Sequence, residues 1–199
     1  MTVSVGARRA ELDDAAVLTA IITAAFANDP LWRDVLAVAD GGIDHYERFW
    51  RINVAGALRY PWVWMTDGGE AAALWIPPGG TELSDEQEDE YVSLAHELLG
   101  PGAADLDELL DQFEAAHPHD VPHYYLPLLA THPDHRGQGL GMDLLRHTLE
   151  LVDAEGAPAY LESSNPVNVP RYRKVGFEPV GEFTSPRGAV VTTMWRAGR

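Results

Sequence analysis

Arg136-Gly137-Gln138-Gly139-Leu140-Gly141 lies between an apolar segment, 124–131, and a segment, 142–153, whose apolar residues have helical spacing. Glycines at such a strand-to-helix turn let the backbone approach a ligand closely, because no Cβ stands in the way. The start of the following helix offers unpaired N–H groups and the positive end of its dipole, which favour a phosphate. This stretch therefore predicts an anion site at a strand-to-helix turn.

Two common phosphate loops do not match this stretch. The dinucleotide-binding fingerprint spaces its glycines differently and lies near the start of a βαβ unit. A Walker loop ends in Lys followed by Ser or Thr, and no such pair follows here. A glycine-rich turn that binds nothing stays open as the alternative on this stretch alone.

A second segment adds an independent signal. It consists of Leu161-Glu162-Ser163-Ser164-Asn165, followed by Asn168-Val169-Pro170-Arg171-Tyr172-Arg173-Lys174-Val175-Gly176-Phe177. Together with His132-Pro133 and the glycine-rich loop, this order resembles the GNAT superfamily of N-acetyltransferases. GNAT enzymes commonly have a pyrophosphate loop of this type, then a strand, an Asn, a short helix carrying a Tyr, and Gly-Phe opening the next strand.

The resemblance implies an α/β fold (α+β by some schemes) with a central, mixed, mostly antiparallel, twisted sheet of about six or seven strands flanked by helices. Local patterns predict strands at 3–8, 62–66, 71–76, 124–131, 159–163, 177–184 and 189–196. They predict helices at 13–27, 44–58, 84–99, 105–116, 142–153 and 169–174. The pair at 84–116 is an insertion before the central strand. Neither a repeat nor a linker interrupts the chain, so we expect one domain over 1–199.

Pro127 is unexpected inside the apolar strand at 124–131, because proline removes a donor from the strand ladder. A bulge would accommodate it, and GNAT enzymes usually have a bulge in this strand beside the co-substrate. The asparagine-aspartate-proline sequence at 28–30 is predicted to end the first helix. Ser84 is predicted to cap the helix at 84–99, with Glu88 near the capping-box position.

Composition excludes several classes of function. There is no cysteine, so neither a thiolate nucleophile nor a cysteine metal site is available. No run of about 18 apolar residues exists for a membrane span, and 1–9 has no apolar signal segment, so a cytoplasmic location is expected. The net charge of -17 argues against nucleic acid and anionic membranes as partners.

The distribution of charge is more informative than its total. No Lys or Arg lies between Tyr60 and His135, and the stretch from Glu82 to Asp120 is dense in carboxylates. A field of this sign attracts a cationic amine. The alternative is a solvated helix face that only keeps the protein soluble.

Acetyl transfer to an amine requires a grip on acetyl-CoA, a neutral amine, a polarised thioester carbonyl and a proton for the leaving thiolate. The resemblance implies that the loop amides hold the pyrophosphate, with Arg136 adding charge. It also implies that the unpaired edge of the bulged strand binds pantetheine, where one amide polarises the carbonyl. The residues expected to bind the co-substrate are Leu129, Ala130, Thr131, Arg136, Gly137, Gln138, Gly139, Leu140 and Gly141. The alternative for 129–131 is an ordinary core strand.

Two asparagines are further candidates for contact with acetyl-CoA. Asn165 lies seven residues before Tyr172, where many GNAT enzymes have an asparagine, and is the preferred candidate. Asn168 lies one helical turn before Tyr172 and either serves instead or caps the short helix.

Tyr172 matches the GNAT tyrosine that protonates the departing thiolate; the alternative is a tyrosine that only packs under the last strand. Many GNAT enzymes have a glutamate base five residues before the asparagine, but that position is Tyr160 here. Glu162 lies two residues further and faces the same side of the strand. Glu162 is therefore the candidate base, directly or through water, with cation binding or a structural role as alternatives. His123 and Tyr124 are the next candidates.

Phe26, Trp32 and Tyr124 are candidate walls of the acceptor pocket, as is Trp64, with core packing as the alternative for each. The histidines at 117, 119 and 123 lie on a segment interrupted by proline, which is poor spacing for a preformed metal site, so no metal is expected.

Several segments, 24–30, 71–77, 133–141, 158–164 and 168–172, resemble the puromycin N-acetyltransferase-like actinobacterial subgroup of GNAT enzymes. That subgroup also has an inserted helical pair before the central strand. This kinship implies acetyl-CoA and Tyr172, but it does not imply puromycin, because the acidic insertion and the region 26–32 depart from the subgroup.

The sequence thus predicts an N-acetyltransferase that moves an acetyl group from acetyl-CoA, a co-substrate, to a primary amine of a small cationic metabolite or antibiotic. One alternative is acetylation of a protein or peptide amine. Another is a catalytically silent acyl-CoA-binding regulatory module, which the tyrosine at position 160 favours. A monomer or homodimer is expected.

Overall fold

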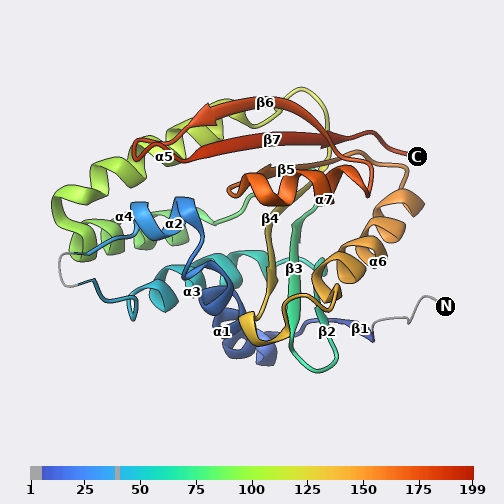
Figure 1. Cartoon of the computed structure of the whole chain (residues 1–199), viewed down its shortest axis with the longest axis horizontal. Coiled ribbons are helices and arrows are strands. Elements are labelled where there is room, and N and C mark those ends of the chain that lie inside the picture. Colours follow the sequence, from blue (N-terminus) through green and yellow to red (C-terminus); the bar gives the residue numbers. More distant parts are fainter. Residues whose placement is uncertain (1–5, 39–40) are drawn as a thin grey trace.

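The computed structural model describes residues 6–38 and 41–199. In that part of the chain, a seven-stranded sheet has the order β1-β2-β3-β4-β5-β7-β6 (Figure 1). Only the β4–β5 pair in it is parallel. The strands are β1 (Ala7–Arg9), β2 (Val63–Thr66), β3 (Ala71–Ile76), β4 (Tyr124–Thr131), β5 (Ala159–Ser163), β6 (Glu178–Thr184) and β7 (Val190–Arg196). The prediction of a mixed, mostly antiparallel sheet is confirmed.

Helices cover both faces of this sheet. They are α1 (Ala15–Phe26), α2 (Pro30–Val35), α3 (Tyr46–Ala57), α4 (Asp85–Leu99), α5 (Ala103–Ala116), α6 (Leu140–Ala154) and α7 (Val169–Arg173). In one buried cluster, the helices α1 through α5 pack on one face of the sheet. In a second cluster, α6 packs on the other face (Figure 1). Among the described residues, no helix is long and apolar enough to cross a membrane.

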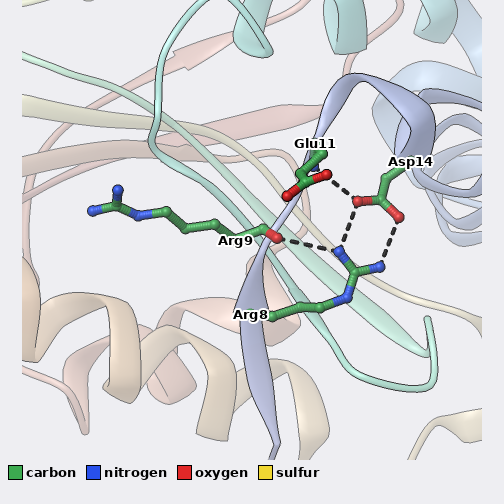
Figure 2. A network of polar contacts seen from close by, with 4 residues as sticks. All are labelled: Arg8, Arg9, Glu11 and Asp14. Atoms are coloured by element: carbon green, nitrogen blue, oxygen red, sulfur yellow. Dashed lines mark hydrogen bonds and ion pairs between the residues drawn. The ribbon is translucent and has the colours of Figure 1, made fainter.

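The N-terminal segment differs from the prediction. β1 begins at Ala7 and ends at Arg9, and positions 3–5 of the predicted strand lie outside the described residues. The Asp14 side chain makes no capping hydrogen bond to α1, because its carboxylate is engaged before the helix starts. It accepts from the Glu11 N–H at 2.8 Å and from both terminal nitrogens of Arg8, at 2.7 and 2.6 Å (Figure 2). These contacts close a 3₁₀ turn, Leu12–Asp14, which joins β1 to α1.

A helix that the sequence analysis missed starts where the first helix was predicted to end. Asp29 caps α2, and its Oδ1 accepts from the N–H groups of Leu31 and Trp32 at 3.0 and 3.4 Å. Pro30 occupies the first turn, where its missing N–H costs nothing. At α4 the predicted cap Ser84 is confirmed, but its capping-box partner is Gln87 rather than Glu88, because Gln87 is the third helical residue.

The bulge predicted at Pro127 is confirmed and shapes the centre of the sheet. Leu74 pairs with Leu128 whereas Ile76 pairs with Tyr125, so two steps along β3 correspond to three along β4. The parallel pairing of β4 with β5 ends at Tyr125↔Tyr160. Beyond this point, the β5-facing edge of β4 has no strand partner among the described residues. The two strands therefore separate on the side from which the chain enters the glycine-rich loop.

Candidate active site

A cavity of about 720 Å³ lies where β4 and β5 separate. Its walls combine the end of α1, the start of α2, the bulge of β4, the end of β5, α7, and the inserted helices α4 and α5 with the loop that precedes them. Segments that are far apart in the sequence thus line one space.

Tyr172 lines the cavity. Its ring packs near Phe177, with centroids 6.3 Å apart, while its hydroxyl makes no hydrogen bond within the described part of the chain. Burial, followed by the nearby Asp29 carboxylate, raises the pKa of Tyr172 to about 12. Asp29 is itself held by the Ser164 hydroxyl, which donates to it at 2.9 Å. Tyr172 is therefore a protonated phenol at neutral pH, with its proton available to a ligand.

Glu162 also lines the cavity, and its side chain is only 3% exposed. Its Oε1 has no hydrogen-bond partner among the described residues, although the Nδ1 atom of His117 is 3.9 Å away. Burial raises the pKa of Glu162 to about 8, against the opposing effect of the Tyr125 and Tyr160 hydroxyls. Burial also lowers the pKa of His117 to about 4, so this imidazole is neutral and gives Glu162 no counter-ion.

The cavity is acidic and aromatic. Among the described residues, no Lys or Arg lines it. The carboxylates that line it are Asp29, Glu82, Glu88, Asp111, Glu114 and Glu162. One wall is formed by the rings of Trp32 and Phe113, stacked with centroids 6.1 Å apart, and by Trp50, whose ring meets Trp32 edge-on at 5.1 Å. Negative potential and aromatic faces both favour an organic cation.

The glycine-rich loop leaves β4 and enters α6. Gly137 and Gly139 have φ angles of 81° and 84°, in the left-handed region that favours glycine. The backbone N–H groups from Gly137 to Met142 have no acceptor among the described residues, which leaves them free for an anion. A Cβ at Gly141 would overlap the Thr131 hydroxyl, so glycine lets α6 approach β4 closely. The loop thus fits a pyrophosphate.

A model of the acetyltransferase (GNAT) family matches residues 59–177, which is more than half of the chain. The chain belongs to the GNAT family. Membership places it among the acetyl-CoA-dependent N-acetyltransferases, and its sheet, flanking helices and separated central strands are the GNAT fold.

Solved structures with the same fold cover nearly the whole chain. One from Corynebacterium glutamicum, described as histone acetyltransferase HPA2 and related acetyltransferase, is 23% identical, with a TM-score of 0.66 over 98% of this chain and 96% of that one. Arylalkylamine N-acetyltransferase 2 from Aedes aegypti is 17% identical, with a TM-score of 0.68 over 97% and 98%. The polyamine N-acetyltransferase of Drosophila melanogaster is 15% identical, with a TM-score of 0.66 over 96% and 98%. At these identities the likeness shows the fold.

The GNAT cavity brings together several of the residues predicted from sequence, namely Phe26, Trp32, Leu129, Glu162, Asn168 and Tyr172. Ala130 and Thr131 follow on the same strand but do not line it. Arg136 is exposed, and its guanidinium donates to the carbonyl of Ala25 at 2.7 Å, which ties the loop to α1. The Asn165 side chain accepts from the N–H of Val167 at 3.1 Å and does not line the cavity.

Tyr124 is the predicted pocket residue that the structure places elsewhere. It packs on the α6 side of the sheet against Trp62, with ring centroids 4.3 Å apart, and Trp64 lies on that same side. The neighbouring Tyr125 lines the cavity instead, because successive side chains of a strand face opposite ways. The histidines at 117, 119 and 123 are ring neighbours, but no group of three His, Cys, Asp or Glu in the described residues is suited to hold a metal ion.

Proposed function

We propose that this GNAT enzyme transfers an acetyl group from acetyl-CoA to the primary amine of a small cationic metabolite or antibiotic. The observation that carries the proposal is a cavity lined by six carboxylate side chains and, among the described residues, by no Lys or Arg. Carboxylates stabilise an ammonium group in a partly desolvated space, and the aromatic wall supports its organic part.

The inserted helices favour a small acceptor over a peptide. The inserted helices α4 and α5 contribute walls to the cavity, so an extended chain would have to displace them. The neighbours described as arylalkylamine and polyamine N-acetyltransferases support an amine acceptor. A single domain, a cytoplasmic location, a monomeric or dimeric state and kinship with the puromycin N-acetyltransferase-like subgroup stay predictions from the sequence.

The arrangement supports direct transfer from acetyl-CoA to the amine. Glu162 takes one proton from the bound ammonium, and the freed nitrogen attacks the acetyl carbon while the unpaired edge of β4 near Leu129 polarises the carbonyl. As the carbon–sulfur bond breaks, Tyr172 gives its proton to the thiolate. The nitrogen then loses a second proton, which returns to the Tyr172 oxygen and leaves the neutral amide. Because a simple thiol has a pKa of about 8.5, far below that of Tyr172, this donation must be concerted with deprotonation of the nitrogen.

The proposal is tested by measuring free-thiol release from acetyl-CoA with a panel of phenethylamine, agmatine, polyamines, puromycin, aminoglycosides, amino acids and short peptides. We expect release with a cationic small amine, and a KM for that amine that rises with ionic strength because salt screens the carboxylates. Release with peptides alone would favour a peptide N-acetyltransferase. Binding of acetyl-CoA without release for any amine would favour the silent acyl-CoA-binding module.

Replacement of Gly137 by Ala should raise the KM for acetyl-CoA by about tenfold. Alanine at a left-handed φ costs about 1–2 kcal/mol, and the loop would relieve that strain by turning its amides away from the pyrophosphate. Steady-state kinetics with acetyl-CoA as the varied substrate measure the effect.

Gly156→Ala is the matched control for this variant. Gly156 also has a positive φ, 66°, and at both positions a Cβ would meet nothing within 4 Å. The two variants should therefore lose similar thermal stability while only Gly137→Ala changes the KM for acetyl-CoA. Equal KM values in the two variants would contradict a pyrophosphate site at the loop.

A further inference from the structure

Glu82 lines the same cavity as Glu162 but comes from a different part of the chain, the loop between β3 and α4. This loop is fixed on both sides of Glu82. The Thr81 carbonyl accepts from Arg59 at 2.6 Å and from the Tyr60 hydroxyl at 3.2 Å, and the Thr81 hydroxyl donates to the Leu83 carbonyl at 2.6 Å. These bonds fix the backbone on both sides of Glu82.

Helix α3 packs closely against the backbone of Glu82. Gly56 in α3 packs directly against the Glu82 carbonyl, and a Cβ at position 56 would overlap that oxygen. On the other side, Ser84 begins α4 with a complete capping box, so the chain direction after Glu82 is also set. A loop built only to connect β3 with α4 would not need such restraint around one acidic residue.

Tyr125 lines the cavity with both carboxyls, and its hydroxyl lowers the pKa of each. A tyrosine hydroxyl has one proton and donates to one acceptor at a time. The Tyr160 hydroxyl donates to the Ala116 carbonyl at 3.2 Å and lowers the pKa of Glu162 without bonding to its Oε1. The buried Oε1 of Glu162 is thus left without a donor among the described residues. Two carboxyls that line one cavity, where no Lys or Arg of the described residues balances their charge, are stabilised by a ligand that brings positive charge.

We propose that Glu82 and Glu162 together form the site for the acceptor's ammonium group, in which Glu82 holds the cation while Glu162 takes its proton. This inference rests on the proposed function and adds to it a second carboxylate that recognises the acceptor. The site requires an amine that carries hydrogen atoms on nitrogen, because each carboxylate accepts an N–H.

The groups around Glu82 agree with this role. Tyr125 of β4 and Tyr91 of α4 lie next to it, and Glu114 of α5 adds a like charge. Glu82 as a residue is exposed, but desolvation of its carboxyl raises its pKa, Tyr125 opposes the rise and Glu114 adds to it. The charge of Glu82 in turn raises the pKa of Glu162. Ionised Glu82 therefore makes Glu162 harder to ionise, and a bound ammonium would offset that repulsion.

The proposal is tested with Glu82→Gln by measuring the binding of phenethylamine and agmatine to the full-length chain by isothermal titration calorimetry at about pH 8.5. Loss of a charged hydrogen-bond acceptor should weaken binding of each amine by about ten- to a hundredfold. In turnover, the KM for the amine should rise by a similar factor while the KM for acetyl-CoA stays unchanged. The acid limb of the kcat/KM profile should also move to lower pH, because Glu162 loses a like-charged neighbour.

Glu108→Gln is the matched control, because it removes the same charge from an exposed position of α5 that does not line the cavity. If Glu82→Gln has the same amine affinity and the same acid limb as Glu108→Gln, the role of Glu82 is overturned. Absence of amine binding by the wild-type chain would overturn it as well. Calorimetry needs no acetyl transfer, so amine binding without thiol release would count against the proposed function while the comparison of variants still decides the role of Glu82.

Discussion

Replacement of Tyr172 by Phe is expected to lower kcat by about 10² to 10⁴, the usual contribution of a general acid. The variant keeps the ring that packs against Phe177 and removes only the hydroxyl, which faces the cavity without a protein partner among the described residues. The KM values for acetyl-CoA and the amine should change little, because the proton is needed when the thiolate leaves. Steady-state kinetics with saturating acetyl-CoA, together with a thermal unfolding curve, measure both effects.

Tyr124→Phe is the matched control for Tyr172→Phe. It removes the same hydroxyl from a tyrosine on the α6 side of the sheet, away from the cavity, and should leave kcat close to that of the wild type. Because the pKa of Tyr172 is raised to about 12, the kcat of the wild type should not fall through ionisation of Tyr172 below about pH 10. If Tyr172→Phe behaves like Tyr124→Phe, Tyr172 is a packing residue and the thiolate obtains its proton elsewhere.

The sequence predicted the centre of the fold better than its periphery. β3, β4 and β5 begin and end at the predicted residues, because their apolar runs are bounded by glycine, proline or polar turns. α2 was missed, because the asparagine-aspartate-proline sequence that ends one helix also supplies the cap and first residue of the next. Aspartate before proline is ambiguous in sequence, and only packing of the Leu31 and Val35 side chains in the core decides it.

The candidate site was predicted where motifs are local and missed where it depends on tertiary structure. The glycine-rich loop and Tyr172 belong to short motifs with fixed neighbours, so their place in the fold followed from the resemblance. Tyr124 and Tyr125 are adjacent, so their side chains point to opposite faces of the sheet. Which of them faces the cavity depends on the register of β4 around the bulge at Pro127, and the sequence alone does not determine that register. Glu82 is one of many carboxylates in the sequence. Its distinguishing feature is the close approach of Gly56, which lies in α3 and is distant in the sequence.

The acidic insertion at 84–116 is a second example of residues whose role depends on tertiary structure. All five of the following carboxylates are exposed, but Glu88, Asp111 and Glu114 line the cavity whereas Asp85 and Asp89 do not. The predictions of substrate attraction and of a solvated helix face therefore apply to different residues of one segment. Helical periodicity separates faces within α4 or α5, but it does not show which face meets the cavity.

Replacement of Glu162 by Gln is expected to lower kcat/KM for the amine by about 10² to 10⁴ and to remove the acid limb of its pH profile. A general base must be ionised to accept a proton, so the wild-type rate should rise with pH around the pKa of about 8. Glutamine has nearly the same shape but cannot accept a proton. The measurement is kcat/KM from pH 6 to about 10, with the free amine's own ionisation determined separately on the substrate.

Stability separates this loss of catalysis from damage to the fold. Burial raises the pKa of Glu162 from 4.5 to about 8, so between these values the folded chain binds more protons than the unfolded chain. Stability therefore falls as pH rises through this window, and above about pH 8 the full cost of the buried charge is present. Glu162→Gln removes that cost, so its Tm should exceed that of the wild type above pH 8, with a gap that narrows toward pH 4.5. A gain of 1 kcal/mol would raise Tm by about 2–4 °C in a chain of this size.

The two measurements together give Glu162 a definite role. A variant that is more stable and much less active identifies a carboxylate kept for its chemistry, because a structural carboxylate would lower stability when replaced. Retention of the acid limb near pH 8 in Glu162→Gln would assign that limb to another group, with Glu82 next in the same cavity. Loss of activity with a lower Tm at every pH would instead show that Glu162 supports the fold through Tyr125 and Tyr160, and the base would then be water.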